Sequence, residues 1–158
     1  MSKEKREISI DELHKEIDLI QGCINRMASN SFLLKGWLVS IIAVVLALSL
    51  DEVNEFIIAI TMILVTISFW YLDAFFLRTE KMYRKMYEWV LKKRKEGETD
   101  FQYDLNPHRF NGQVEGIIKV MFSNTLRWFY GMILFLIIVV IIYYLWPVIL
   151  NVLCECRK

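Results

Sequence analysis

The stretch FIIAITMILVTISFWYLDAFFL, residues Phe56–Leu77, decides the fold class. Its only charged residue is Asp73, and it is long enough to cross a bilayer, which takes about 20 residues at a rise of about 1.5 Å each. Two further stretches, Phe32–Leu50 and Trp128–Leu150, are apolar over a similar length. The sequence therefore predicts an all-α integral membrane protein with three transmembrane helices.

The composition agrees with this class. Apolar side chains make up 56% of the 158 residues and aromatic side chains 14%, as in lipid-facing helices joined to a modest polar part. The net charge of +1 conceals a strong segregation, because residues 78–95 carry eight Lys and Arg against two Glu. A nucleic-acid-binding protein would spread its basic residues more evenly, so nucleic acid is not an expected partner.

The distribution of Lys and Arg predicts the orientation in the membrane. The turn between the first two spans, Asp51–Glu55, carries only acidic charge, whereas Arg78–Arg127 has eleven basic residues and the arm up to Lys35 has six. Since basic residues are retained on the cytoplasmic side, we expect the N-terminus and residues 78–127 in the cytoplasm. The acidic turn and the tail Asn151–Lys158 are then expected outside the cell's inner membrane.

Five successive parts follow from these patterns. They are a cytoplasmic N-terminal heptad helix (1–31), a transmembrane hairpin (32–77), a cytoplasmic basic amphipathic helix with a linker and an interfacial helix (78–127), a third transmembrane helix (128–150) and a short tail (151–158). A cytoplasmic helical layer is expected from residues 9–30, 78–96 and 113–123.

The second span is expected to continue beyond the membrane. No Pro or Gly occurs between Glu55 and Glu96, so one helix of about forty residues is predicted. Beyond it, Gly97–Gly112 has the composition of a linker, and Asn106-Pro107 predicts a turn or helix start within it. Gln113–Phe122 is too short and too polar to span, which favours a short packed or interfacial helix.

A heptad pattern precedes the first span. Ser9-Ile10-Asp11-Glu12 predicts a capping box at a helix start. The apolar residues that follow are spaced alternately by three and four, and the same phase continues into the first span; they are Ile10, Leu13, Ile17, Ile20, Ile24 and Met27. Only Ser29-Asn30-Ser31 interrupts the pattern, as a break or a second cap. This seam either packs on the chain's own cytoplasmic helices or forms an oligomer contact.

Asp73 is the one carboxylate within an apolar run, and its position predicts a place near the cytoplasmic boundary. Ionisable residues in membrane helices are costly and often mark function. The simpler interpretation is that Asp73 reaches headgroup water or pairs with Lys35, Arg78 or Arg127. Both interpretations stay open from the sequence.

Small polar residues recur along the second span. Thr66 lies on the same helix face as Asp73, and Thr61 on the same face as Ser68. Such residues hold helices together more often than they line pores. The pore or gating candidates are Thr61, Thr66, Ser68, Asp73 and Arg78, joined by Ser40 of the first span. The third span is counted as apolar from Arg127 to Tyr143 and is not expected to line a pore.

A basic face follows the second span. Its residues are Lys81, Arg84, Lys85, Lys92, Lys93 and Arg94. Anionic headgroups attract basic residues near the membrane surface by about 1 kcal/mol each, and a phosphate-bearing ligand could use the same charges. We expect the headgroup contact.

No pattern for chemistry is recognisable. Three cysteines and two histidines are too scattered in the sequence for a metal site. The sequence shows neither a phosphate-binding loop nor a nucleophile with a neighbouring base. We expect no catalytic residue, no metal and no cofactor, and the chain is not expected to be an enzyme.

The segment FWYLDAFFLRTEKMYRKMY, Phe69–Tyr87, resembles the end of a membrane helix running into a cytoplasmic helix in SLATT-type effectors of bacterial nucleotide-signalling and antiphage operons. The resemblance covers about the first hundred residues, and the third span departs from the family's two-span pattern. It implies an oligomeric inner-membrane protein that perforates or depolarises the membrane when a partner signals infection. Asp73 and Arg78 correspond to features of the hairpin exit.

The sequence therefore leads to one functional hypothesis and two alternatives. The hypothesis is an oligomeric membrane effector that permeabilises or depolarises the inner membrane in phage defence, acting with the lipid bilayer, further copies of itself and a cytoplasmic sensor protein or nucleotide signal. The first alternative is a non-conducting anchor or accessory subunit that recruits a cytoplasmic partner. The second is a sensor of a small ligand such as a nucleotide.

Overall fold

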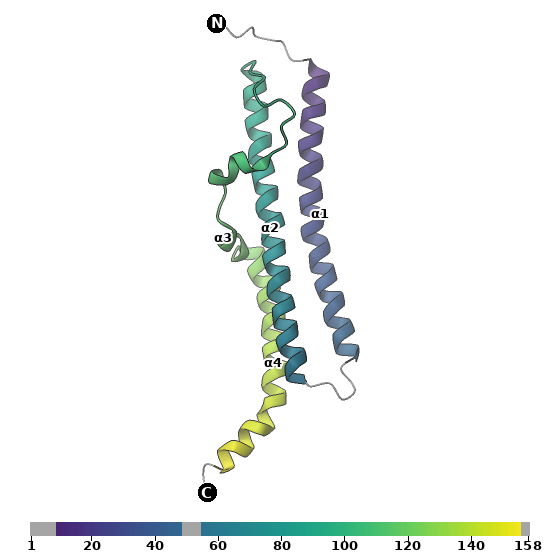
Figure 1. Ribbon diagram of the computed structural model, residues 1–158, viewed down its shortest axis with the longest axis vertical. Helices are drawn as coiled ribbons and strands as arrows, with labels where there is room; N and C mark the ends of the chain where they lie inside the picture. The colour runs from purple at the N-terminus through teal and green to yellow at the C-terminus, as the bar shows by residue number, and fades with distance from the viewer. Residues whose placement is uncertain (1–8, 49–54, 156–158) are drawn as a thin grey trace. The chain divides into compact units, whose positions relative to one another are not determined.

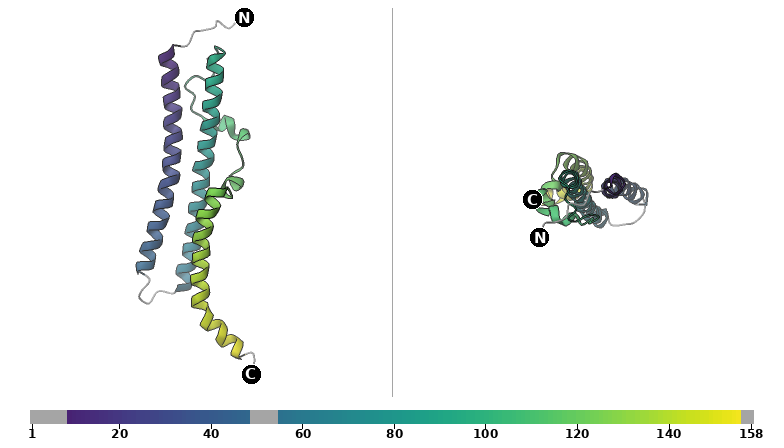
Figure 2. Two further views of the ribbon diagram at one scale, coloured as in Figure 1. Left: turned by 180° about the vertical axis from the view of Figure 1, so that it is seen from behind. Right: turned by 90° about the horizontal axis from the view of Figure 1, so that it is seen from above.

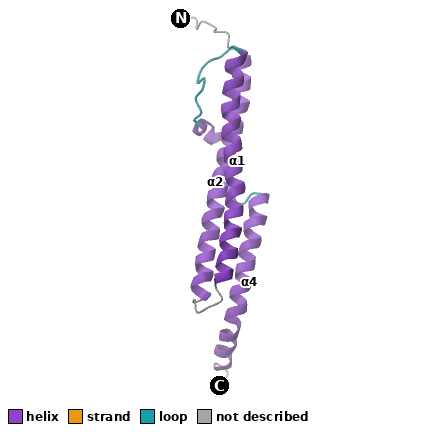
Figure 3. Cartoon of the chain, turned by 90° about the vertical axis from the view of Figure 1, so that its right-hand side faces the viewer, coloured by secondary structure: helices purple, strands orange, loops and turns teal. Residues whose placement is uncertain are grey.

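The computed structural model describes residues 9–48 and 55–155, which consist of helices and connecting loops (Figure 3). In chain order the elements are α1 (Ile10–Leu48), α2 (Glu55–Lys95), the 3-10 helix η1 (Pro107–Gln113), α3 (Ile117–Met121) and α4 (Asn124–Glu155) (Figure 1). The acidic turn predicted between the first two spans falls largely on residues 51–54, outside the described residues.

Three of these helices, α1, α2 and α4, are long and apolar enough to cross a membrane. Their most apolar stretches have mean hydropathies of 1.8, 1.9 and 2.3. Each of these stretches is about as long as a bilayer crossing requires. The chain is therefore an all-helical integral membrane protein with three candidate spans, and the predicted fold class is confirmed.

Helix α1 starts where the capping pattern predicts. The Ser9 hydroxyl accepts a hydrogen bond from the backbone N–H of Asp11 (3.3 Å), and the Ser9 carbonyl accepts one from Leu13 N–H (3.1 Å). The break considered at Ser29-Asn30-Ser31 is absent, because α1 is continuous from Ile10 to Leu48. Each of these three residues lowers helix stability by only tenths of a kcal/mol. The packing of the apolar residues on either side contributes more than that.

Helix α2 is one helix of 41 residues, as the absence of Pro and Gly predicts. The helix start predicted at Asn106-Pro107 in the linker is the start of η1. There the Asn106 side chain accepts a hydrogen bond from His108 N–H (3.1 Å). Seen from behind, η1 lies beside α2 (Figure 2). The predicted short helix is present as α3, although it covers only Ile117–Met121.

The chain divides into two compact units. Unit 1 comprises Met1–Leu33 and Ala74–Val120, and unit 2 comprises Leu34–Asp73 and Met121–Lys158. The core of unit 1 is formed by Ile20 of α1, by Phe110 of η1 and by three residues of α2, which are Met82, Met86 and Val90.

The heptad seam contributes to this core in its middle part. Ile20 is 1% exposed, and Ile24 packs beside it. Leu13, Ile17 and Met27 are half-buried, whereas Ile10 is 71% exposed. The middle of the seam thus packs within the chain against α2, and its first residue points to solvent.

We predict that Met86→Ala destabilises unit 1 by about 2–5 kcal/mol, because the side chain is fully buried and its removal leaves a cavity. The measurement is hydrogen exchange of the backbone amides of residues 10–33 and 74–95 in detergent micelles. Leu19→Ala is the matched control, since Leu19 is 42% exposed and its loss should change stability by about 0.5 kcal/mol or less. Equal exchange in the two variants would contradict this assignment of the core.

Candidate functional site

A buried polar cluster around Asp73 joins the three long helices within unit 2. Asp73 of α2 is 0% exposed. Lys35 Nζ of α1 lies 2.5 Å from Asp73 Oδ2, and the Tyr130 hydroxyl of α4 donates to the same oxygen at 2.9 Å. Of the pairings that the sequence allows for Asp73, the structure has the one with Lys35.

The charges in this cluster depend on one another. The Lys35 side chain is 22% exposed and that of Asp73 is 0% exposed, so both groups have lost much of their hydration. The attraction between two such charges repays the desolvation only when the geometry is good and further hydrogen bonds are made. Tyr130 supplies such a bond. Removal of Lys35 or of Asp73 takes the counter-charge from the other residue of the ion pair.

Trp70 extends the cluster by one turn of α2. Its indole N–H donates to the Met121 carbonyl at 2.8 Å. Its ring stacks on Tyr130, with centroids 5.7 Å apart and planes at 8°, and meets Phe122 edge to face at 5.3 Å. Because Trp70 and Asp73 are three residues apart on one helix face, the same stripe of α2 holds both the start of α4 and the residues before it.

The hydroxyls of the second span are satisfied by their own helix. Thr66 is 0% exposed and donates to the Met62 carbonyl (2.7 Å). Thr61 and Ser68 lie on the exposed side and donate to the carbonyls four residues earlier at 2.8 Å, and Ser40 of α1 does the same at 3.0 Å. The two faces of α2 that the spacing predicts are thus one buried and one exposed.

Arg78 ties the linker to α2 within unit 1. Its Nε donates to the Glu115 carbonyl at 2.9 Å, and its Nη2 donates to the Asn111 side chain. The Glu115 carboxylate is bonded by Lys119 (2.9 Å) and Lys81 (3.1 Å). These two ammonium groups lower the pKa of Glu115 below its usual value of 4.5. Arg78 therefore fastens the segment between η1 and α3 to α2.

A buried ion pair closes the other end of unit 1. Arg94 Nε and Nη2 each donate to one Glu16 oxygen at 2.9 Å, and the side chains are 1% and 2% exposed. Arg94 Nη1 also donates to the Glu98 carbonyl, and Glu16 accepts from Tyr103 N–H (3.1 Å). The sequence places Arg94 on an exposed basic face, and the structure differs because Glu16 draws its guanidinium inward.

Carboxylates also balance most of the other residues of the basic face. The pairs are Lys81–Glu115, Arg84–Glu80, Lys85–Glu88 and Lys93 with both Glu96 and Glu98. The hydrogen bonds that the Lys93 ammonium donates to Glu98 and Glu96 raise the pKa of Lys93. Counting charge over residues 78–95 alone misses Glu16, Glu96, Glu98 and Glu115, which lie elsewhere in the sequence. Lys92 is exposed, and its charge is directed to solvent.

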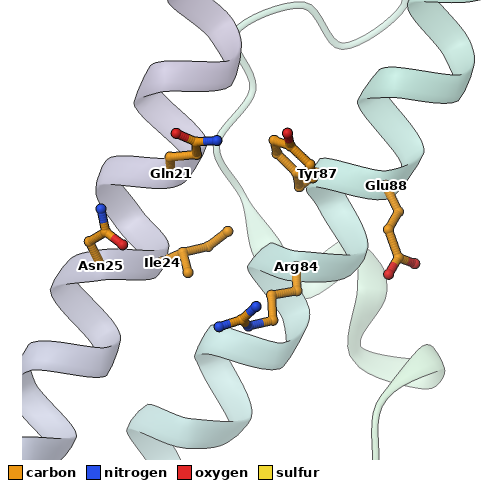
Figure 4. A pocket seen from close by; sticks show the side chains of 6 residues that line it. All are labelled: Gln21, Ile24, Asn25, Arg84, Tyr87 and Glu88. Atoms are coloured by element: carbon orange, nitrogen blue, oxygen red, sulfur yellow. The ribbon is translucent and has the colours of Figure 1, made fainter.

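A groove of about 480 Å³ lies between α1 and α2 in unit 1, and Figure 4 shows its lining. The lining residues are Gln21, Ile24, Asn25, Arg84, Tyr87 and Glu88. Its one cation, Arg84, is bonded to Glu80 at 2.8 Å, and Glu88 is bonded to Lys85. The groove therefore presents amides and one aromatic ring with little net charge.

The described residues contain no group of three His, Cys, Asp or Glu side chains placed to hold a metal ion. Cys23 is buried as a free thiol, and the side chains of Cys154 and Cys156 lie outside the described part of the chain. The residue of the Asp73 cluster that the sequence does not single out is Tyr130, because its ring lies in an otherwise apolar run. In the sequence, the signal for this contact is the Tyr130 hydroxyl, which is a polar group within an apolar run. Searches against family models, curated proteins and solved structures found no match for this chain.

We predict that Arg94→Met destabilises unit 1 by about 3–5 kcal/mol, because it leaves the Glu16 carboxylate buried without its counter-charge. The matched control is Arg84→Met, whose 62% exposed side chain takes part in a surface pair worth about 0–1 kcal/mol. Thermal unfolding in micelles, followed by circular dichroism, compares the two. The double variant Glu16→Leu/Arg94→Met should recover much of the loss, and a double variant no more stable than Arg94→Met would contradict the assignment.

Proposed function

We propose that this chain is an oligomeric effector of the bacterial inner membrane that permeabilises or depolarises the membrane in phage defence. The observation that carries the proposal is the ion pair of Lys35 and Asp73, set in apolar stretches that contain no other charged residue. Charged groups inside membrane helices are costly, and they commonly belong to ion or proton pathways. The resemblance of Phe69–Tyr87 to SLATT-type effectors supports the same function.

Several copies are required, because one chain has too few helices to enclose a conduit. Only 6%, 33% and 11% of the most apolar stretches of α1, α2 and α4 are buried within the chain. Most of the span surface is therefore free to contact lipid or further copies. The exposed hydroxyls of Ser40, Thr61 and Ser68 lie on that surface, where they would contact another copy or line a conduit between copies.

The proposed orientation places unit 1 in the cytoplasm, with the turn between α1 and α2 and the end of α4 outside. The asymmetry of Lys and Arg supports it. In this orientation unit 1 would receive the activating signal, from a cytoplasmic sensor protein or a nucleotide. A nucleotide has the weaker support, because most of the basic face is paired with carboxylates.

A second function, an anchor that recruits a cytoplasmic protein, is favoured by the loop that follows α2. Phe101 and Tyr103 adopt left-handed backbone angles (φ of 58° and 60°), which are uncommon for residues other than glycine. Their side chains are 57% and 41% exposed. Glu16 holds the Tyr103 N–H, and the Arg109 guanidinium lies 4.2 Å from the Phe101 ring centroid. Rigidly presented aromatic side chains are frequent anchors in protein interfaces.

The test is membrane potential, read with a voltage-sensitive dye, in bacteria that express the chain from an inducible promoter. We expect rapid depolarisation by the parent, and a slower or ion-selective change with Thr61→Ala/Ser68→Ala. Each hydroxyl donates to a carbonyl of its own helix, so the loss of both should leave the fold intact. The matched control is Thr79→Ala, which removes the same kind of bond (2.8 Å to the Phe75 carbonyl) beyond the proposed pore.

A polarised culture with abundant membrane-inserted protein would contradict the effector function. The anchor would then be the remaining proposal, and it predicts that Phe101→Ala/Tyr103→Ala abolishes capture of the cytoplasmic partner.

A further inference from the structure

The outward face of α4 carries a hollow of about 470 Å³ in unit 2. It is lined by Arg127, Trp128, Gly131, Met132 and Phe135. Trp128, Met132 and Phe135 are each more than 60% exposed. Gly131 leaves open space in the lining, because no atom lies within 4 Å of the position that a Cβ would occupy there. The hollow is thus an apolar surface with one cation at its end.

Arg127 is less compensated than the basic residues of unit 1. It donates one long hydrogen bond, 3.4 Å from Nη2 to Asn124 Oδ1, and among the described residues no carboxylate pairs with it. It lies one turn before Tyr130, whose hydroxyl bonds Asp73 at the polar end of the apolar helices. The exposed guanidinium therefore lies at the end of the apolar surface of α4.

We propose that this hollow binds one anionic phospholipid, with the phosphate on Arg127 and an acyl chain over Gly131. A guanidinium matches phosphate with two parallel hydrogen bonds, and Trp128 has the amphipathic ring that settles at the headgroup level. The apolar lining beyond Arg127 selects a lipid over a free phosphate ion, since only a lipid covers Met132 and Phe135.

The headgroup contact expected for the basic face of α2 stays a separate prediction, because most of that face is already paired within the chain. Lys81, Arg84, Lys85, Lys93 and Arg94 pair with carboxylates. Lys92 lies fifteen residues beyond Leu77 in α2, which is about 22 Å at 1.5 Å per residue. That distance exceeds the Debye length of about 8 Å at physiological ionic strength, so the proposed lipid contact depends on Arg127 and not on Lys92.

The test is native mass spectrometry of the full chain in detergent, titrated with phosphatidylglycerol or phosphatidylcholine. We expect preferential binding of one phosphatidylglycerol and a loss of affinity of about tenfold in Arg127→Gln, the effect of removing a charge-assisted contact. Gly131→Leu fills the hollow and should weaken binding as well. The controls are Arg26→Gln, an arginine of unit 1, and Gly36→Leu, which also adds a side chain in open space.

Three results would overturn the proposal. The first is equal binding of the two lipids by the parent, which means that the headgroup charge is not recognised. The second is unchanged phosphatidylglycerol binding in both Arg127→Gln and Gly131→Leu. The third is displacement of the lipid by millimolar inorganic phosphate, which would show a site for the free ion. This last measurement uses the parent chain alone and holds even where a variant fails to fold.

Discussion

The ion pair between Lys35 and Asp73 is the constraint on which the arrangement of unit 2 depends. Lipid tails are as apolar as leucine side chains, so burial of apolar surface gives membrane helices little reason to choose particular neighbours. In unit 2, polar contacts determine which helices pack together. Lys35 brings α1 to Asp73, Tyr130 brings α4 to the same oxygen, and the Trp70 indole fixes the residues before α4.

Unit 1 combines burial of apolar side chains, which is favourable in itself, with a buried ion pair. Ile20, Met86 and Phe110 form an apolar core, and the pair of Glu16 and Arg94 fixes the loop after α2 upon it. A buried pair of this kind contributes little net stability but penalises any arrangement that separates it. The two left-handed residues of that loop are each held by one contact: Glu16 accepts from Tyr103 N–H, and the Arg109 guanidinium packs on the Phe101 ring.

The lengths of the apolar runs were sufficient to predict three membrane helices, and the absence of Pro and Gly predicted the continuous α2. Local patterns also placed the start of α1 at Ser9 and of η1 at Pro107. The pairing of charges could not be predicted in this way, since Glu16 and Arg94 are 78 residues apart and only tertiary packing brings them together. Tyr130 was missed because a phenol in an apolar run was counted with its apolar neighbours.

The account is tested most directly by a double-mutant cycle on Lys35→Met and Asp73→Asn, with the free energy of unfolding measured in lipid bicelles. It predicts that each single substitution is strongly destabilising and that the two are coupled by about 1–3 kcal/mol. The exposed pair Lys85–Glu88 serves as the control, with an expected coupling of about 0–1 kcal/mol. Additive effects of Lys35→Met and Asp73→Asn, within about 0.5 kcal/mol, would contradict the claim that this pair organises the membrane helices.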